Sequence, residues 1–130
     1  MDIFGVFGIR GRSKEVFRFE DALRGLGLKP EVVSHALKLA AIKLMKEAKE
    51  RNTFSLEADC SKAAPIICYS ILGPEAYMRA NGAEALEAAE KRLISAIKLG
   101  ESLDARLAML TLLSKAIHPD VIKKFDLKID

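Results

Sequence analysis

Two histidines and two cysteines are the side chains of this sequence best suited to metal binding or nucleophilic chemistry: His35, His118, Cys60 and Cys68. A di-iron helical bundle requires a Glu three residues before a histidine ligand, and neither histidine here has one. A structural zinc site requires four close ligands, but the cysteines are distant from both histidines along the chain. We therefore predict no metal site and no bound cofactor.

One histidine is followed by a lysine at helical spacing in the stretch SHALKLAAIKL, Ser34 to Leu44. His35 and Lys38 fall on the polar face of an expected helix, where another protein can reach them. This pattern resembles the phosphorelay motif of histidine phosphotransfer domains, although that family has Gly where Leu39 stands here. The resemblance implies phosphoryl transfer through His35, which is one alternative function.

The first residues, MDIFGVFGIRGR, differ in composition from the rest of the chain. Glycines interrupt a run of Ile, Phe and Val, so we expect residues 1–14 to form a short extended arm rather than a helix. Glycine-rich backbone beside Arg10, Arg12 and Lys14 is suited to phosphate binding. The stretch FGVFGIRG also resembles the FGTSGIRG opening of phosphohexomutases, whose arginine contacts phosphate. Together with the Lys-rich face of the long helix, the arm indicates nucleic-acid or phosphate-ligand binding as a second alternative.

Apolar residues outside any obvious core predict an interface. Phe4 and Phe7 of the arm need cover, either from the body of the protein or from a second copy. On the wheel of the long helix, Ile42 lies inside the charged face, and Leu39 and Met45 flank it. These residues favour a homo-oligomer, with a dimer as its simplest form.

The composition is that of one compact helical domain. The chain has 130 residues, of which 50% are hydrophobic, 30% are charged and 6% are aromatic. Ala and Leu dominate, and they favour helix over strand. We expect an all-α fold, with a compact bundle of four to six helices over residues 15–130 and the arm before it. The expected helices span about 19–24, 30–51, 55–72, 83–99 and 103–117.

Local signals predict several helix ends. The pairs Gly73-Pro74 and Asn81-Gly82 should separate helices, and Gly100 should end one. Pro65 should kink or restart the helix that contains it, because proline lacks the backbone N–H and clashes with the preceding turn. Pro119 should begin one last helical turn near the end of the chain.

The helix expected over residues 103–117 is apolar on almost every side, so it is either surrounded by other helices or lies in a subunit interface. Its polar strip consists of Asp104, Thr111 and Lys115, with Arg106 apart from them. The tripeptide His-Pro-Asp that follows resembles that of J-domain cochaperones. In that family the preceding helix has a basic outer face, which this helix lacks.

Charge and cysteine usage bear on location and partners. The net charge of +3 is below the usual excess of a nucleic-acid-binding domain, so nucleic acid is the less favoured partner. Cys60 and Cys68 would lie ~12 Å apart along one helix, too far for a disulfide, so we expect buried thiols. No leader opens the chain, and no apolar run approaches 18 residues. We expect a cytoplasmic protein without membrane association.

The function most consistent with these features is association rather than catalysis. The sequence contains no P-loop, no dinucleotide fingerprint and no nucleophile elbow. Scarce amides, with no Gln and two Asn, are also typical of thermophile proteins. We expect a non-enzymatic protein that acts through self-association or as a subunit of a larger complex.

Overall fold

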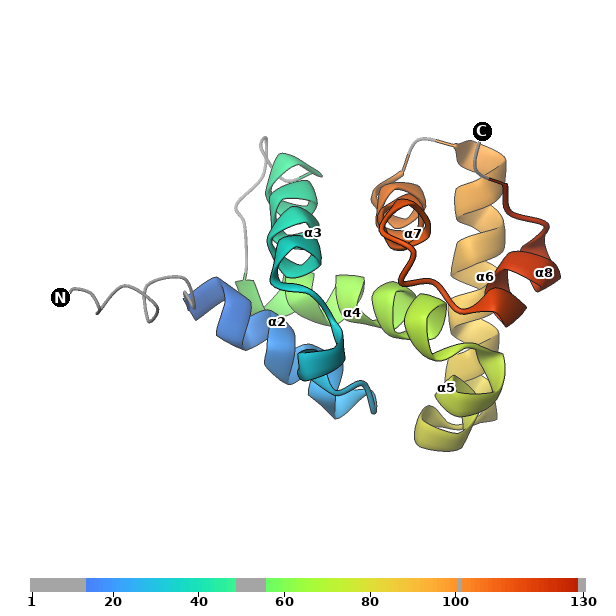
Figure 1. The fold of residues 1–130 in the computed structure, drawn as a ribbon, viewed down its shortest axis with the longest axis horizontal. Coiled ribbons are helices and arrows are strands. Elements are labelled where there is room, and N and C mark those ends of the chain that lie inside the picture. The colour runs from blue at the N-terminus through green and yellow to red at the C-terminus, as the bar shows by residue number, and fades with distance from the viewer. Residues whose placement is uncertain (1–13, 49–55, 101, 129–130) are drawn as a thin grey trace, which may run out of the picture.

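The computed structural model describes residues 14–48, 56–100 and 102–128, which Figure 1 shows as a ribbon. These residues form α-helices and one 3-10 turn, with no strand among them, so the all-α prediction is confirmed. Of the arm expected over residues 1–14, only Lys14 lies within the described part. In chain order the elements are α2 (Lys14–Gly25), η1 (Pro30–Val32), α3 (His35–Ala48), α4 (Leu56–Leu72), α5 (Pro74–Asn81), α6 (Ala83–Leu99), α7 (Leu103–Leu113) and α8 (Pro119–Phe125).

The number of helices is larger than predicted, because the described residues contain seven where four to six were expected. The short helices α5 and α8 are separate elements that begin at Pro74 and Pro119. Helix α2 begins at Lys14, five residues before its expected start, and Glu15 in its first turn favours this start by opposing the helix dipole.

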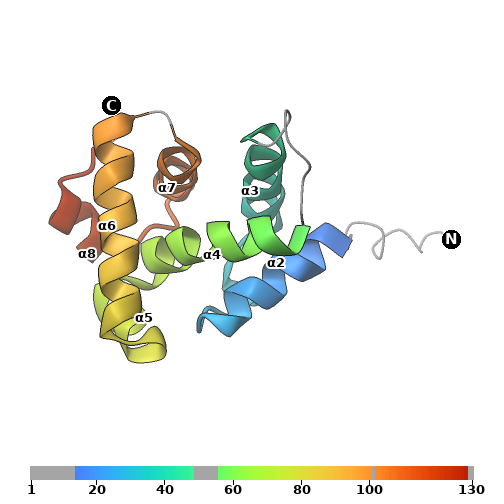
Figure 2. The ribbon, with the colours of Figure 1, turned by 180° about the vertical axis from the view of Figure 1, so that it is seen from behind.

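Helix α4 is the centre of the fold. It contacts α2, α3, α5, α6 and α7, and Figures 1 and 2 show it running between the α2–α3 pair and the α5–α6–α7 group. Residues 63, 64 and 66–70 are all 0% exposed, so its second half is enclosed on almost every side. Cys60 and Cys68 are free and buried, as predicted. Burial raises the pKa of the Cys68 thiol to about 12, which keeps it protonated at neutral pH.

Pro65 lies inside α4, and the helix continues through it rather than restarting there. Proline has no N–H, so the carbonyl of Ser61, one turn earlier, loses its helical partner. Ser61 is exposed, so water can hydrogen bond to that carbonyl. The helix therefore tolerates this proline at one of its few accessible positions.

His118, directly before α8, hydrogen bonds to the end of α4. The His118 backbone N–H donates to the Ser70 carbonyl (2.7 Å), and its Nδ1 accepts from the Asp120 N–H (3.0 Å), which caps α8. Its ring packs so closely on Gly73 that a Cβ there would lie 2.7 Å from the ring Cγ. The predicted helix start at Pro119 is confirmed, and the His-Pro-Asp sequence is a helix start in this chain.

The expected long helix over residues 30–51 is divided at its beginning. Residues Pro30–Val32 form a 3-10 turn, Val33 is extended, and α3 begins at His35. The Ser34 hydroxyl accepts from the Leu37 N–H (3.1 Å), which is the hydrogen bond of a helix N-cap. Ser34 therefore sets the start of α3. Residues 49–55 lie outside the described part.

The buried face of α3 differs from the predicted one. Ile42 and Met45, which we expected to be exposed at an interface, are 4% and 0% exposed and belong to the core. The reason is Lys38, which the sequence placed on the solvent face. Its ammonium is buried and donates to the Glu20 carboxylate of α2 (2.6 Å), so the face that packs inward is centred on Lys38.

This buried ion pair predicts a specific stability effect. Replacing Lys38→Met leaves the Glu20 carboxylate without its lysine partner, and this should lower the free energy of unfolding by about 3–5 kcal/mol. The double variant Glu20→Leu/Lys38→Met should recover most of that loss, because it removes both buried charges. Urea denaturation of the three proteins measures both effects.

The matched control is Arg24→Ala, which breaks the exposed Arg24–Asp21 pair. Exposed pairs contribute about 0–1 kcal/mol. A Lys38→Met variant no less stable than Arg24→Ala would contradict the role given to the buried pair.

Candidate functional site

The residues predicted to bind phosphate are not gathered at one described site. Arg10 and Arg12, together with Phe4 and Phe7 of the expected interface, lie outside the described residues. Lys14 is the exposed first residue of α2. The prediction of phosphate binding by the arm therefore stays a prediction.

The two residues of the phosphorelay resemblance lie in different environments. His35 is exposed at the start of α3, whereas the Lys38 side chain is 8% exposed and bound to Glu20. Leu39, where that family has Gly, is 46% exposed on the same helix. His35 and Lys38 thus do not share an open face to which a phosphoryl donor and its protein would bind.

A polar cluster joins α4, α6 and α8, and sequence reasoning missed it. The Tyr69 hydroxyl of α4 donates to Glu90 Oε2 of α6 (2.7 Å), and Lys124 of α8 donates to the same oxygen (2.7 Å). The Tyr69 ring packs edge-to-face against Tyr77 and Phe125. Burial is the main cause that raises the pKa of Tyr69. The hydrogen bond to Glu90 and the negative charge of Glu90 raise this pKa further. With Tyr69 0% exposed, the cluster links helices rather than presenting a catalytic acid to a substrate.

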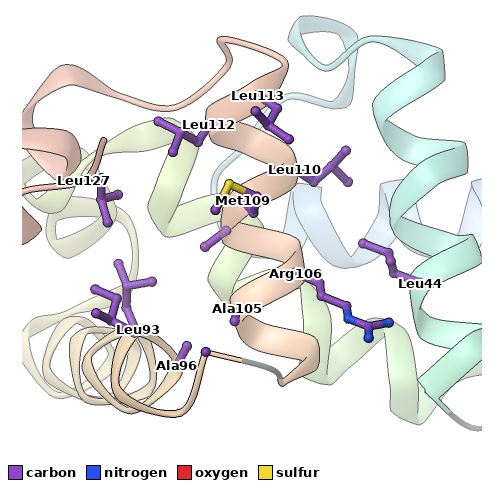
Figure 3. A pocket seen from close by; sticks show the side chains of 13 residues that line it. Leu44, Leu93, Ala96, Ala105, Arg106, Met109, Leu110, Leu112, Leu113 and Leu127 are labelled. Carbon is purple, nitrogen blue, oxygen red and sulfur yellow. The ribbon is translucent and has the colours of Figure 1, made fainter. Parts of the chain in front are cut away.

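A hollow over α7 is a candidate binding site. Its volume is about 510 Å³, and we call it the α7 groove. Helix α7 forms its floor. Figure 3 shows Arg106 and Leu110 on the side that faces Leu44 of α3, and Leu93 and Ala96 of α6 on the other side. The lining comprises Leu44, Leu93, Ala96, Ile97, Gly100, Ala105, Arg106, Ala108, Met109, Leu110, Leu112, Leu113 and Leu127.

The outer stripe of α7 explains why the groove is open. Leu107 and Thr111 are 0% exposed and belong to the inner face, where the Thr111 hydroxyl donates to the Ala108 carbonyl (2.7 Å). Met109 and Leu113, at helical spacing on the outer face, are 48% and 60% exposed. Other helices therefore enclose the inner face of this helix, whereas the alternative of a subunit interface stays a prediction for its outer face. Its outer face has no cover among the described residues.

The groove offers surface for binding but no chemistry for catalysis. Its lining side chains are apolar except for Arg106, so they include no nucleophile, general acid or general base. Within the described ranges, no three His, Cys, Asp or Glu residues are grouped to hold a metal ion. No helix in those ranges is long and apolar enough to cross a bilayer.

Comparison with known proteins gives no relative: no protein-family model, no curated protein and no solved structure matches this chain. The site therefore has to be interpreted from its own chemistry.

The Tyr69–Glu90 hydrogen bond predicts how stability depends on alkaline pH. A tyrosine in the unfolded chain ionises near pH 10. Because the folded-state pKa of Tyr69 is raised, its contribution to stability is fully present below about pH 10 and is lost as pH rises above it. In Tyr69→Phe the unfolding free energy should be lower by about 1–2 kcal/mol at pH 8. Above pH 10 the unfolding free energy of Tyr69→Phe should fall less steeply than that of wild type. The two slopes should differ by ~1.4 kcal/mol per pH unit.

Chemical denaturation of wild type and Tyr69→Phe from pH 8 to 11 measures both slopes. Other buried groups contribute equally to the two proteins, so the difference isolates Tyr69. Parallel curves across that range would mean that its phenol ionises as easily in the folded state as in the unfolded one.

Proposed function

We propose that this chain is a non-enzymatic protein that acts by association, and that its simplest assembly is a homodimer. The observation that carries the proposal is a concentration of exposed, large apolar side chains on two adjacent helices. We call these residues the α6–α7 surface: Ile94, Ile97, Met109 and Leu113, which are between 44% and 60% exposed. Leu99, at 73% exposed, lies on another side of α6. The other large, exposed apolar residues of the described part, on α2, η1, α3 and α5, lie on separate elements.

Physical chemistry favours covering such a surface. Burial of apolar area contributes about 25 cal/mol per Å², and exposed apolar patches of several hundred Å² on small proteins are typical of interaction sites. Ile97, Met109 and Leu113 also line the α7 groove, so the surface is hollowed rather than flat. A two-fold dimer would bring the same surface from each copy together.

A cytoplasmic location accompanies this proposal. Both cysteines are free and buried, which is usual for proteins of a reducing compartment.

The proposal predicts the effect of a charge on this surface. Leu113→Glu should weaken dimerisation roughly tenfold or more, because a carboxylate buried without a partner costs several kcal/mol. Helicity should be unchanged, since Leu113 is 60% exposed in the monomer. Light scattering across micromolar to millimolar concentrations should give a mass near twice 14.3 kDa for wild type and near 14.3 kDa for the variant.

The matched control is Leu39→Glu, at an apolar residue of α3 that is 46% exposed and that we expected at the interface from sequence. If only Leu39→Glu separates the copies, the interface is on α3 and the α6–α7 surface is the wrong choice. A wild-type mass of 14.3 kDa at every concentration would remove the dimer altogether.

A further inference from the structure

Arg106 is the one charged side chain among the described residues that line the α7 groove. Arg24, Arg79 and Arg92 pair with Asp21, Glu75 and Asp104, respectively. No hydrogen-bond acceptor in the described part of the chain pairs with the Arg106 guanidinium, which is exposed on the outer face of α7. An unpaired arginine at an apolar hollow is suited to a ligand that carries one negative charge.

The size of the groove fits a small ligand. Its volume of about 510 Å³ lies within the roughly 300–1,000 Å³ of small-molecule sites, which are largely apolar with a few polar groups that orient the ligand. Here the orienting group is Arg106, at the side of the groove that Leu44 and Leu110 also line (Figure 3).

The lining also excludes several ligand classes. A sugar or a nucleobase presents several polar groups, and each would lose its water without gaining a partner among Leu, Ile, Met and Ala side chains. An extended peptide has the same difficulty with its backbone N–H and C=O groups. A hydrocarbon chain has no polar group to satisfy and gains about 0.8 kcal/mol per buried CH₂.

We propose that the α7 groove binds an amphiphile with one hydrocarbon chain and one anionic head, of the fatty-acid carboxylate type. The carboxylate pairs with the Arg106 guanidinium, which offers two parallel N–H donors to its two oxygens. The chain lies against Leu44, Met109, Leu110 and Leu113.

This inference does not rest on dimerisation, although Met109 and Leu113 belong to both the groove and the α6–α7 surface. A second copy and a hydrocarbon chain would contact the same side chains, so ligand is expected to change the dimerisation equilibrium. The two proposals fail separately. If the protein is a monomer that binds the ligand, only the dimer proposal is contradicted. If it is a dimer that does not bind the ligand, only the ligand proposal is contradicted.

Isothermal titration calorimetry with octanoate, decanoate and dodecanoate, each below its micelle-forming concentration, tests the proposal. We expect one site per chain and an affinity that rises about fourfold for each added CH₂. Arg106→Gln should weaken dodecanoate binding roughly 10- to 100-fold, because it removes a charge-assisted hydrogen bond. Arg106→Lys should recover part of the loss, since it keeps the charge but not the paired donors.

The controls distinguish the contribution of the anionic head group from that of the hydrocarbon chain. They also distinguish binding in the groove from binding elsewhere on the surface. Arg79→Gln removes an exposed arginine of α5 that is outside the groove, and it should leave binding unchanged. Dodecanol has the chain without the charge, and it should bind wild type as weakly as dodecanoate binds Arg106→Gln. Dodecyl phosphate distinguishes the head groups, and tight binding of it with no binding of dodecanoate would overturn the carboxylate assignment.

Three other results would contradict the proposal as a whole. They are no saturable heat with any of the three acids, equal affinity of dodecanoate for wild type and Arg106→Gln, and several weak sites per chain that do not depend on chain length. Circular dichroism of each variant confirms that the fold is intact, which the exposure of Arg106 leads us to expect.

Discussion

The burial of α4 is the constraint on which the rest of the structure depends. Its second half is buried around almost all of its circumference, and fully burying a single Ile side chain contributes about 1.5–3 kcal/mol. One neighbour cannot cover such a helix, so α2 and α3 pack at one end and α5, α6 and α7 at the other (Figures 1 and 2). Helix α7 must turn Leu107 and Thr111 inward to do this. The opposite face of α7, with Met109 and Leu113, is then exposed and forms the floor of the α7 groove.

Polar links, of which Lys38–Glu20 is the most buried, join the helices that surround α4. The Lys38–Glu20 pair joins α3 to α2, and Glu90 joins α6 to both α4 and α8. Arg92 donates to both carboxylate oxygens of Asp104, which joins α6 to α7. Non-directional apolar packing would allow these helices to slide, whereas a hydrogen bond is made in one register. The Arg92–Asp104 pair therefore holds the α6 wall of the α7 groove against its α7 floor.

Sequence reasoning succeeded where local chemistry decides the structure and failed where a distant residue does. The helix boundaries at Gly73-Pro74, Asn81-Gly82 and Gly100 follow from backbone properties of a few neighbouring residues, and all are confirmed. The predicted buried face of α3 was wrong because Lys38 points inward and donates a hydrogen bond to Glu20. That residue lies 18 positions away in the sequence. Arg106 was visible as a charge apart from the polar strip of its helix. Whether Arg106 has a carboxylate partner among the described residues depends on the tertiary structure. The spacing of residues along one helix does not contain that information.

We propose above that apolar association takes place at α7. Methyl NMR spectra of the wild-type chain, recorded over a dilution series from millimolar to micromolar concentration, test it most directly. We expect concentration-dependent shifts for the methyl groups of Ile94, Ile97, Met109 and Leu113, and constant positions for those of Val32 and Leu39. Spectra that do not change with concentration, or changes confined to α3 and η1, would contradict it.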